Sequence, residues 1–124
     1  PEASTLPDPK AHRPTREPDM SDILKDLEAT IVARKEADPE SSWTAKLLSK
    51  GPEKCAEKFG EEAIEAIIAA AKNDRDNLTY EAADVLYHLL VMLAARDVAL
   101  DDVLNELARR QGVSGIAEKA SRGA

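Results

Sequence analysis

Apolar residues recur at helical spacing along the first patterned stretch of the chain, which runs from Met20 to Asp38-Pro39. The repeating positions are Ile23, Leu24, Leu27, Ile31 and Val32. Steps of three and four residues place these side chains on one face of a helix, and a proline ends the helix that precedes it. The pattern therefore predicts an amphipathic helix that packs through one face.

Two long helices joined by a short turn are predicted in the middle of the chain. The first runs from about residue 52 to 72, after a Gly-Pro step that stops one element and starts the next. The second runs from about 78 to 96, after the polar residues 73–77, which can also cap it. Residues 40–51 can form at most a short helix, and residues 101–110 form another amphipathic helix before a last short segment. Since no strand pattern or internal repeat occurs, the expected fold is all-α, an antiparallel helical bundle.

The second long helix is expected to be apolar on nearly all sides. Residues 85–95 form an apolar run that is interrupted by His88, so we expect this helix to be largely buried. The run falls short of the roughly 18 residues that span a bilayer, and no signal peptide is visible. We therefore expect a soluble protein with no membrane contact.

The start of the chain differs from the rest. Residues 1–19 contain five of the seven prolines and show no hydrophobic periodicity. This composition predicts a flexible proline-rich leader, followed by one domain at residues 20–124. The sequence leaves open whether the leader is native.

Composition favours a partner chain of the same kind. Charged residues make up 33% of the 124 residues, aromatic residues make up 3%, and much of the 43% apolar content is alanine, so few bulky side chains fill a core. Such a small domain gains stability when homodimerisation completes its bundle. The net charge of −7 argues against nucleic acid as a partner. The single cysteine, Cys55, forms no internal disulfide, which fits a cytoplasmic protein.

Two pairs of acidic residues stand at helical spacing, Glu62 with Glu65 and Glu81 with Asp84. Residues three apart share a helix face, and the second pair opens the apolar run, so its carboxylates are carried into a buried helix. Antiparallel pairing of the two long helices brings both pairs together near their shared turn. Four converging carboxylates repel one another and require a cation.

Oxygen ligands alone favour a hard divalent ion, Mg²⁺ or alternatively Mn²⁺. A carboxylate site that holds hydrated Mg²⁺ suits the cleavage of a phosphoanhydride, because the ion neutralises phosphate charge and acidifies water. Glu61 is a spare carboxylate beside this site that could accept the proton of the attacking water.

Each of these residues also has a plainer interpretation. Acidic pairs at this spacing are common on solvated helix faces, but Asp84 and His88 are flanked by apolar residues, which argues against that interpretation. His88 is expected to orient Asp84 rather than to bind metal. Lys58 either pairs with Glu61 or Glu62 or binds phosphate, and Lys46 lies in the loop segment, where a substrate clamp could form.

At these residues the chain resembles the phosphoribosyl-ATP pyrophosphatases of histidine biosynthesis, within the MazG-type all-α nucleotide pyrophosphatases. The matching runs are 42–48 (Ser-Trp-Thr-Ala-Lys-Leu-Leu), 57–65 (Glu-Lys-Phe-Gly-Glu-Glu-Ala-Ile-Glu), 81–90 (Glu-Ala-Ala-Asp-Val-Leu-Tyr-His-Leu-Leu) and 115–122 (Gly-Ile-Ala-Glu-Lys-Ala-Ser-Arg). The resemblance covers essentially the chain from Met20 onward, and the leader lies outside the pattern.

The resemblance implies hydrolysis of phosphoribosyl-ATP to phosphoribosyl-AMP and pyrophosphate, with Mg²⁺, by a homodimer of helical subunits. It implies four metal ligands, which are Glu62, Glu65, Glu81 and Asp84. It makes Glu61 the candidate for water activation. It also implies that Thr44, Lys46 and Lys58 contact phosphate or ribose.

Two other functions fit the same motifs. One is a house-cleaning pyrophosphatase of the same superfamily that acts on non-standard nucleoside triphosphates with the same metal chemistry. The other is a non-catalytic helical dimerisation module in which the acidic residues bind a structural ion. The number of metal ions, the identity of the general base and the dimer geometry are left open.

Overall fold

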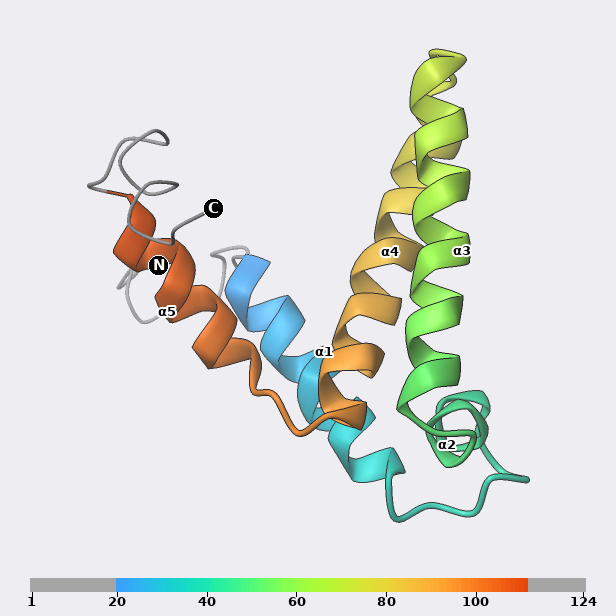
Figure 1. Ribbon diagram of the computed structural model, residues 1–124, viewed down its shortest axis with the longest axis vertical. Coiled ribbons are helices and arrows are strands. Elements are labelled where there is room, and N and C mark those ends of the chain that lie inside the picture. The colour runs from blue at the N-terminus through green and yellow to red at the C-terminus, as the bar shows by residue number, and fades with distance from the viewer. Residues whose placement is uncertain (1–19, 112–124) are drawn as a thin grey trace, which may run out of the picture.

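The computed structural model describes residues 20–111, which form five helices and, within that range, no strand (Figure 1). The helices are α1 (Met20–Arg34), α2 (Trp43–Ser49), α3 (Pro52–Ala71), α4 (Arg75–Ala95) and α5 (Leu100–Arg110). The predicted all-α class is confirmed. The predicted leader and the predicted last short segment lie outside the described residues.

The antiparallel pair of α3 and α4 dominates the molecule, and its turn is tighter than predicted. Asn73 takes a left-handed conformation with φ of 58°, which asparagine tolerates better than most residues. The Asp74 side chain then accepts a hydrogen bond from the Asn77 N–H at 3.2 Å and so caps α4. Because of this cap α4 begins at Arg75, three residues earlier than the sequence pattern predicted.

The predicted short helix is α2, which packs against α1, α3 and α4. Ser42 caps it, since its hydroxyl oxygen accepts a hydrogen bond from the Ala45 N–H at 3.1 Å. Gly51 then adopts φ of 101°, a value that side chains disfavour, and Pro52 opens α3. This Gly-Pro step turns the chain from α2 into the long helix pair.

The core lies at one end of the α3–α4 pair, where α1, α2 and the start of α5 meet it. Its buried side chains are Ile31, Leu47, Cys55, Leu90, Val91, Ala94 and Leu100. Burial raises the pKa of the Cys55 thiol, whose sulfur lies 3.5 Å from the Leu47 carbonyl oxygen. The core therefore fixes the lower end of the helix pair and leaves its upper end to project (Figure 1).

The prediction that α4 is largely buried is wrong for the single chain. Its buried residues are Glu81, His88, Leu90, Val91 and Ala94. The upper part of the α3–α4 pair extends beyond α1 and α2 (Figure 1), so nothing in the described part of the chain covers its outer sides. We call the exposed residues Ile64, Ile67, Ile68 and Leu86 the outer apolar surface.

The helix that contains the apolar run 85–95 is 21 residues long. By length and composition, α4 is the one helix among the described residues that could cross a membrane. Its lower half nevertheless belongs to the protein core, through Leu90, Val91 and Ala94, and Glu81 and His88 place polar side chains among its buried residues. The apolar character of α4 is therefore explained in part by core packing.

Candidate metal centre

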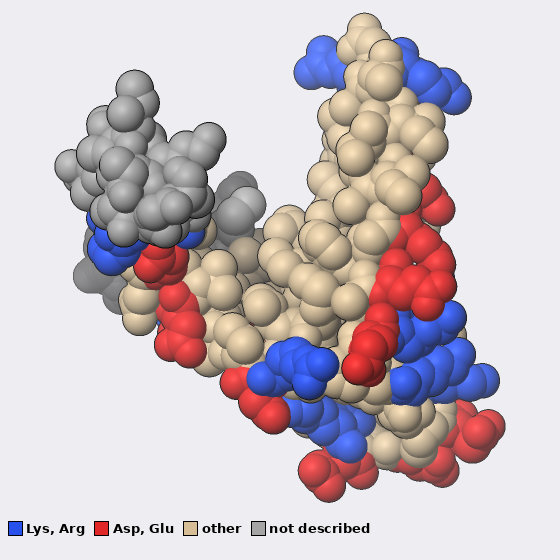
Figure 2. Space-filling view, in the orientation of Figure 1, with Lys and Arg blue, Asp and Glu red and all other residues tan. Residues whose placement is uncertain are grey.

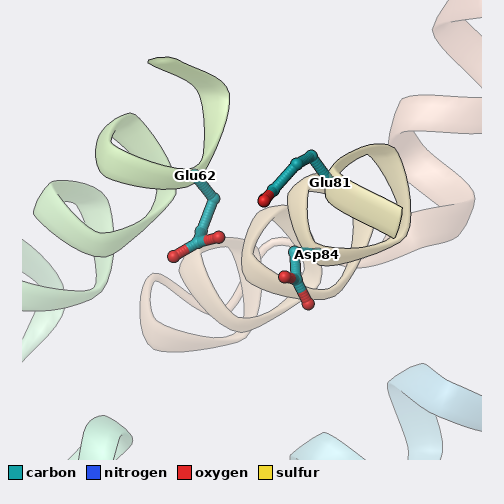
Figure 3. A group of neighbouring side chains, drawn as sticks. All are labelled: Glu62, Glu81 and Asp84. Atoms are coloured by element: carbon teal, nitrogen blue, oxygen red, sulfur yellow. The ribbon is translucent and has the colours of Figure 1, made fainter. Parts of the chain in front are cut away.

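Three carboxylates from α3 and α4 lie near one another, close to the middle of both helices (Figure 3). Glu62 comes from α3, while Glu81 and Asp84 come from α4, and their ligand oxygens all lie within 4.8 Å of one another. Antiparallel packing sets the two helices face to face, and the three-residue step from Glu81 to Asp84 keeps both on the side toward α3. The structure thus brings together three of the four predicted metal ligands.

Glu81 is the most buried of the three, with 8% of its surface exposed. Its Oε1 atom is buried and has no hydrogen-bond partner among the described residues. Burial raises the pKa of Glu81, and the negative charges of Glu65, Glu62 and Asp84 raise it further. Such a carboxylate must take up a proton or meet a cation.

Glu65, the fourth predicted ligand, is exposed on α3 and is not part of the three-carboxylate group. Its charge is nevertheless one of the causes that raise the pKa of Glu81. Glu65 therefore borders the group without joining it in this arrangement of side chains.

The donor set fits a hard divalent cation. All three converging groups are carboxylates, and Glu81 keeps an unpaired oxygen inside the contact between the helices. Mg²⁺ and Mn²⁺ prefer oxygen ligands of this kind, and either ion would relieve the mutual repulsion of the carboxylates.

His88 lies one helical turn beyond Asp84 on α4 and is buried, with 6% of its surface exposed. Burial lowers the pKa of His88, although Glu62 and Asp84 act in the opposite direction. Its Nδ1 atom has no hydrogen-bond partner among the described residues. The predicted orientation of Asp84 by His88 therefore stays a prediction.

Lys58 forms an ion pair with Glu61, with 3.0 Å between Nζ and Oε1. This pair lowers the pKa of Glu61 and raises the pKa of Lys58. Figure 2 shows Lys and Arg side chains directly below the acidic side chains on this part of the molecule. The predicted pairing of Lys58 with a neighbouring glutamate is confirmed, and both side chains lie on α3 next to the carboxylates.

The two predicted substrate contacts on α2 differ in their surroundings. Lys46 is exposed and has no described ion-pair partner. The hydroxyl of Thr44 forms a hydrogen bond with the hydroxyl of Tyr87 on α4. Tyr87 was not among the predicted site residues. A signal for it was present in the sequence, since Tyr87 follows Asp84 by three residues on an apolar helix. Buried tyrosine hydroxyls usually find a hydrogen-bond partner, so a polar partner could have been expected.

Known proteins match most of this chain. The sequence profile of the family described as phosphoribosyl-ATP pyrophosphohydrolase matches residues 24–111. A phosphoribosyl-ATP pyrophosphatase of Rhodobacter capsulatus is 80% identical over 100 residues, which cover 81% of this chain and 97% of that protein. The enzymes of the same name from Dinoroseobacter shibae and Ruegeria pomeroyi are 79% and 81% identical, each over 81% of this chain and over 98% and 95% of their own lengths.

Proposed function

The chain belongs to the phosphoribosyl-ATP pyrophosphohydrolase family, and from that premise we propose that it hydrolyses phosphoribosyl-ATP to phosphoribosyl-AMP and pyrophosphate, the second step of histidine biosynthesis. The group of three carboxylates, with its buried and unpaired Glu81 oxygen, supports this proposal and indicates which residues form the site. A triphosphate substrate arrives with several negative charges, so this acidic group needs a cation to accept it.

Glu62, Glu81 and Asp84 are the proposed ligands of Mg²⁺, or alternatively Mn²⁺, and Glu65 is proposed to join them through a change of rotamer. When bound, the ion would neutralise phosphate charge and lower the pKa of a nearby water molecule. Glu62 on α3 and Glu81 and Asp84 on α4 would fix where between the two helices the ion is held, and so where the triphosphate can be accepted.

Glu61 is proposed as the proton acceptor, and Lys58 controls its basicity. While Lys58 is paired with it, the pKa of Glu61 is lowered and the carboxylate is a poor base. A substrate phosphate that attracts Lys58 would release Glu61, and the pKa of Glu61 would then rise. The base would become effective only when substrate is present.

Thr44, Lys46 and Lys58 are proposed to contact the phosphate or ribose groups. Lys46 is exposed and has no described ion-pair partner, so its ammonium group is available to an anion. Thr44 lies partly buried beside α4, where its hydroxyl meets Tyr87. His88 is proposed to keep Asp84 oriented.

We also propose a homodimer that works in the cytoplasm. The outer apolar surface is exposed, with Ile67 at 64% exposure. A second copy that covers this surface would bury Ile64, Ile67 and Ile68 of α3 and Leu86 of α4. The buried free thiol of Cys55 fits a reducing compartment.

A substrate panel tests the proposed activity. The protein is incubated with Mg²⁺ and either phosphoribosyl-ATP or a set of standard and non-standard nucleoside triphosphates, and released pyrophosphate is measured. We expect release from phosphoribosyl-ATP alone. Release from the triphosphate set would instead assign a house-cleaning activity, and no release from any compound would assign a non-catalytic role.

A further inference from the structure

A hydrogen bond between two hydroxyl groups joins α2 to α4. The partners are Thr44 and Tyr87, which lie 43 residues apart in the chain. Both side chains are partly buried, and the Tyr87 ring packs against the hydrophobic core. Since packing holds the ring, the Tyr87 hydroxyl has a fixed position. Its hydrogen bond to Thr44 can therefore hold α2 in place relative to α4.

The chemistry of the two groups favours one direction for this hydrogen bond. A phenol, with a pKa near 10, is a stronger donor than an aliphatic alcohol, and its oxygen is a weaker acceptor. Tyr87 therefore donates and the Thr44 oxygen accepts. The hydroxyl hydrogen of Thr44 is then free to be donated to a third group, and the incoming hydrogen bond polarises it for an anionic acceptor.

This arrangement lies next to the carboxylates. Tyr87 follows Asp84 by three residues on α4, so the two side chains are neighbours on the helix surface, with about 5–6 Å between their Cβ atoms. The Tyr87 ring also meets the buried His88 ring edge-on, with 4.9 Å between centroids and an interplanar angle of 79°. Tyr87 thus contacts both the predicted substrate-binding helix and the histidine beside the metal centre.

We propose that Tyr87 is a positioning residue that holds and polarises the Thr44 hydroxyl for donation to a phosphate oxygen of the substrate. This inference rests on the proposed function, because it assigns Thr44 to the triphosphate of phosphoribosyl-ATP. Tyr87 itself does not touch the substrate. Tyr87 affects substrate binding only through Thr44. Removing the Tyr87 hydroxyl should therefore have no effect on KM once the Thr44 hydroxyl has been removed.

The test is a double-mutant cycle with Tyr87→Phe and Thr44→Val, in which kcat and KM for phosphoribosyl-ATP are measured with saturating Mg²⁺. Phenylalanine keeps the ring against the core and against His88 and removes only the hydroxyl. We expect Tyr87→Phe to raise KM about five-fold, the value of one ordinary hydrogen bond, with a smaller effect on kcat. Thr44→Val should raise KM at least about ten-fold, and the double variant should equal Thr44→Val alone.

Two further variants separate this role from a merely structural one. Thr44→Ser keeps a hydroxyl, so Tyr87→Phe should again raise KM in that background. Tyr80→Phe removes a phenol hydroxyl from an exposed position on the same helix and should leave KM unchanged. An effect of Tyr87→Phe that persists fully in Thr44→Val, or that equals the effect of Tyr80→Phe, would overturn the inference alone. Wild-type protein that releases no pyrophosphate from phosphoribosyl-ATP would overturn the proposed function together with it.

Discussion

Glu81 shows most clearly how a single residue of this chain is prepared for a cation. Its carboxylate is buried beside Glu62 and Asp84, and its pKa is raised by burial and by these charges. The folded state therefore binds the Glu81 proton more tightly than the unfolded chain does. As pH rises from about 4.5, the ordinary pKa of the group, through the raised value, the metal-free fold loses stability.

Replacing Glu81 by glutamine should stabilise the protein when no metal is present. In EDTA at pH 7.5 we expect Glu81→Gln to unfold a few degrees higher than wild type, because a buried charge has been removed. Millimolar Mg²⁺ should raise the thermal midpoint of wild type and leave that of Glu81→Gln unchanged, since a ligand stabilises only the fold that binds it. Circular dichroism measures both midpoints.

The matched control is Glu53→Gln, which makes the same change at an exposed position in the first turn of α3. It should respond to EDTA and to Mg²⁺ as wild type does. A Glu81→Gln variant that is less stable than wild type in EDTA, or that gains as much from Mg²⁺, would contradict the role given to Glu81.

At the residue scale, spacing alone predicted much of the site. Glu62, Glu81 and Asp84 could be placed together because helical periodicity and antiparallel pairing depend on local sequence. The Thr44–Tyr87 contact could not be predicted, because it depends on how α2 is placed against α4 across 43 residues of chain. The absence of Glu65 from the three-carboxylate group could not be predicted either, because helical periodicity places a residue on a helix face without fixing how far its side chain reaches.

At the scale of elements, α5 depends on α1 for its first hydrogen bond. Ala99 occupies the N-cap position of α5 and has no side-chain acceptor. Glu28 of α1 supplies one, since its Oε2 atom accepts a hydrogen bond from the Leu100 N–H at 2.8 Å. Lys25 of α1 also forms an ion pair with Asp101 of α5, with 3.3 Å between Nζ and Oδ1. The two helices are therefore joined at a cap that the sequence of α5 itself lacks.

Glu28→Ala should destabilise the protein by about 1 kcal/mol, the usual cost of a lost helix cap. Ala99→Asp should restore most of that loss in the same chain, because Ala99 has the extended backbone that an N-cap residue needs. Urea unfolding measures both variants. If the double variant is no more stable than Glu28→Ala, the loss does not come from the cap.

Helix existence was predictable and helix starts were less so. The apolar repeats of α1, α3 and α5 indicate helices directly. The predicted start of α4 lies three residues too late, because the polar residues that form its first turn resemble a linker. Only the geometry of the Asn73–Asp74 turn distinguishes the two possibilities.

At the scale of the whole molecule, the other helices of a single chain cover only the lower part of the α3–α4 pair (Figure 1). Sequence predicted burial for α4, whereas the single chain exposes the outer apolar surface over the upper part of the pair (Figure 1). The burial of a residue depends on every chain in an assembly. The structure of one chain therefore does not show what a partner chain would cover. The homodimer stays a prediction that accounts for both observations.

Ile67→Glu should abolish the proposed dimer. It places a charge on the outer apolar surface, and a partner chain that covers this surface would have to take that charge out of water. Sedimentation velocity should find twice the mass of the chain for wild type and the mass of one chain for the variant. Asn105→Glu, which adds the same charge to an exposed position on α5, is the control and should leave the dimer intact. Wild-type protein that sediments as a single chain would contradict the prediction.

The central claim is that carboxylates from two facing helices hold the divalent ion that pyrophosphate release requires. The most direct test is the Mg²⁺ concentration that gives half-maximal release from phosphoribosyl-ATP, compared among wild type, Glu62→Gln, Asp84→Asn and the control Glu53→Gln. The account predicts that this concentration rises at least about ten-fold for Glu62→Gln and for Asp84→Asn, while the control matches wild type. Equal Mg²⁺ requirements in all four proteins would contradict it.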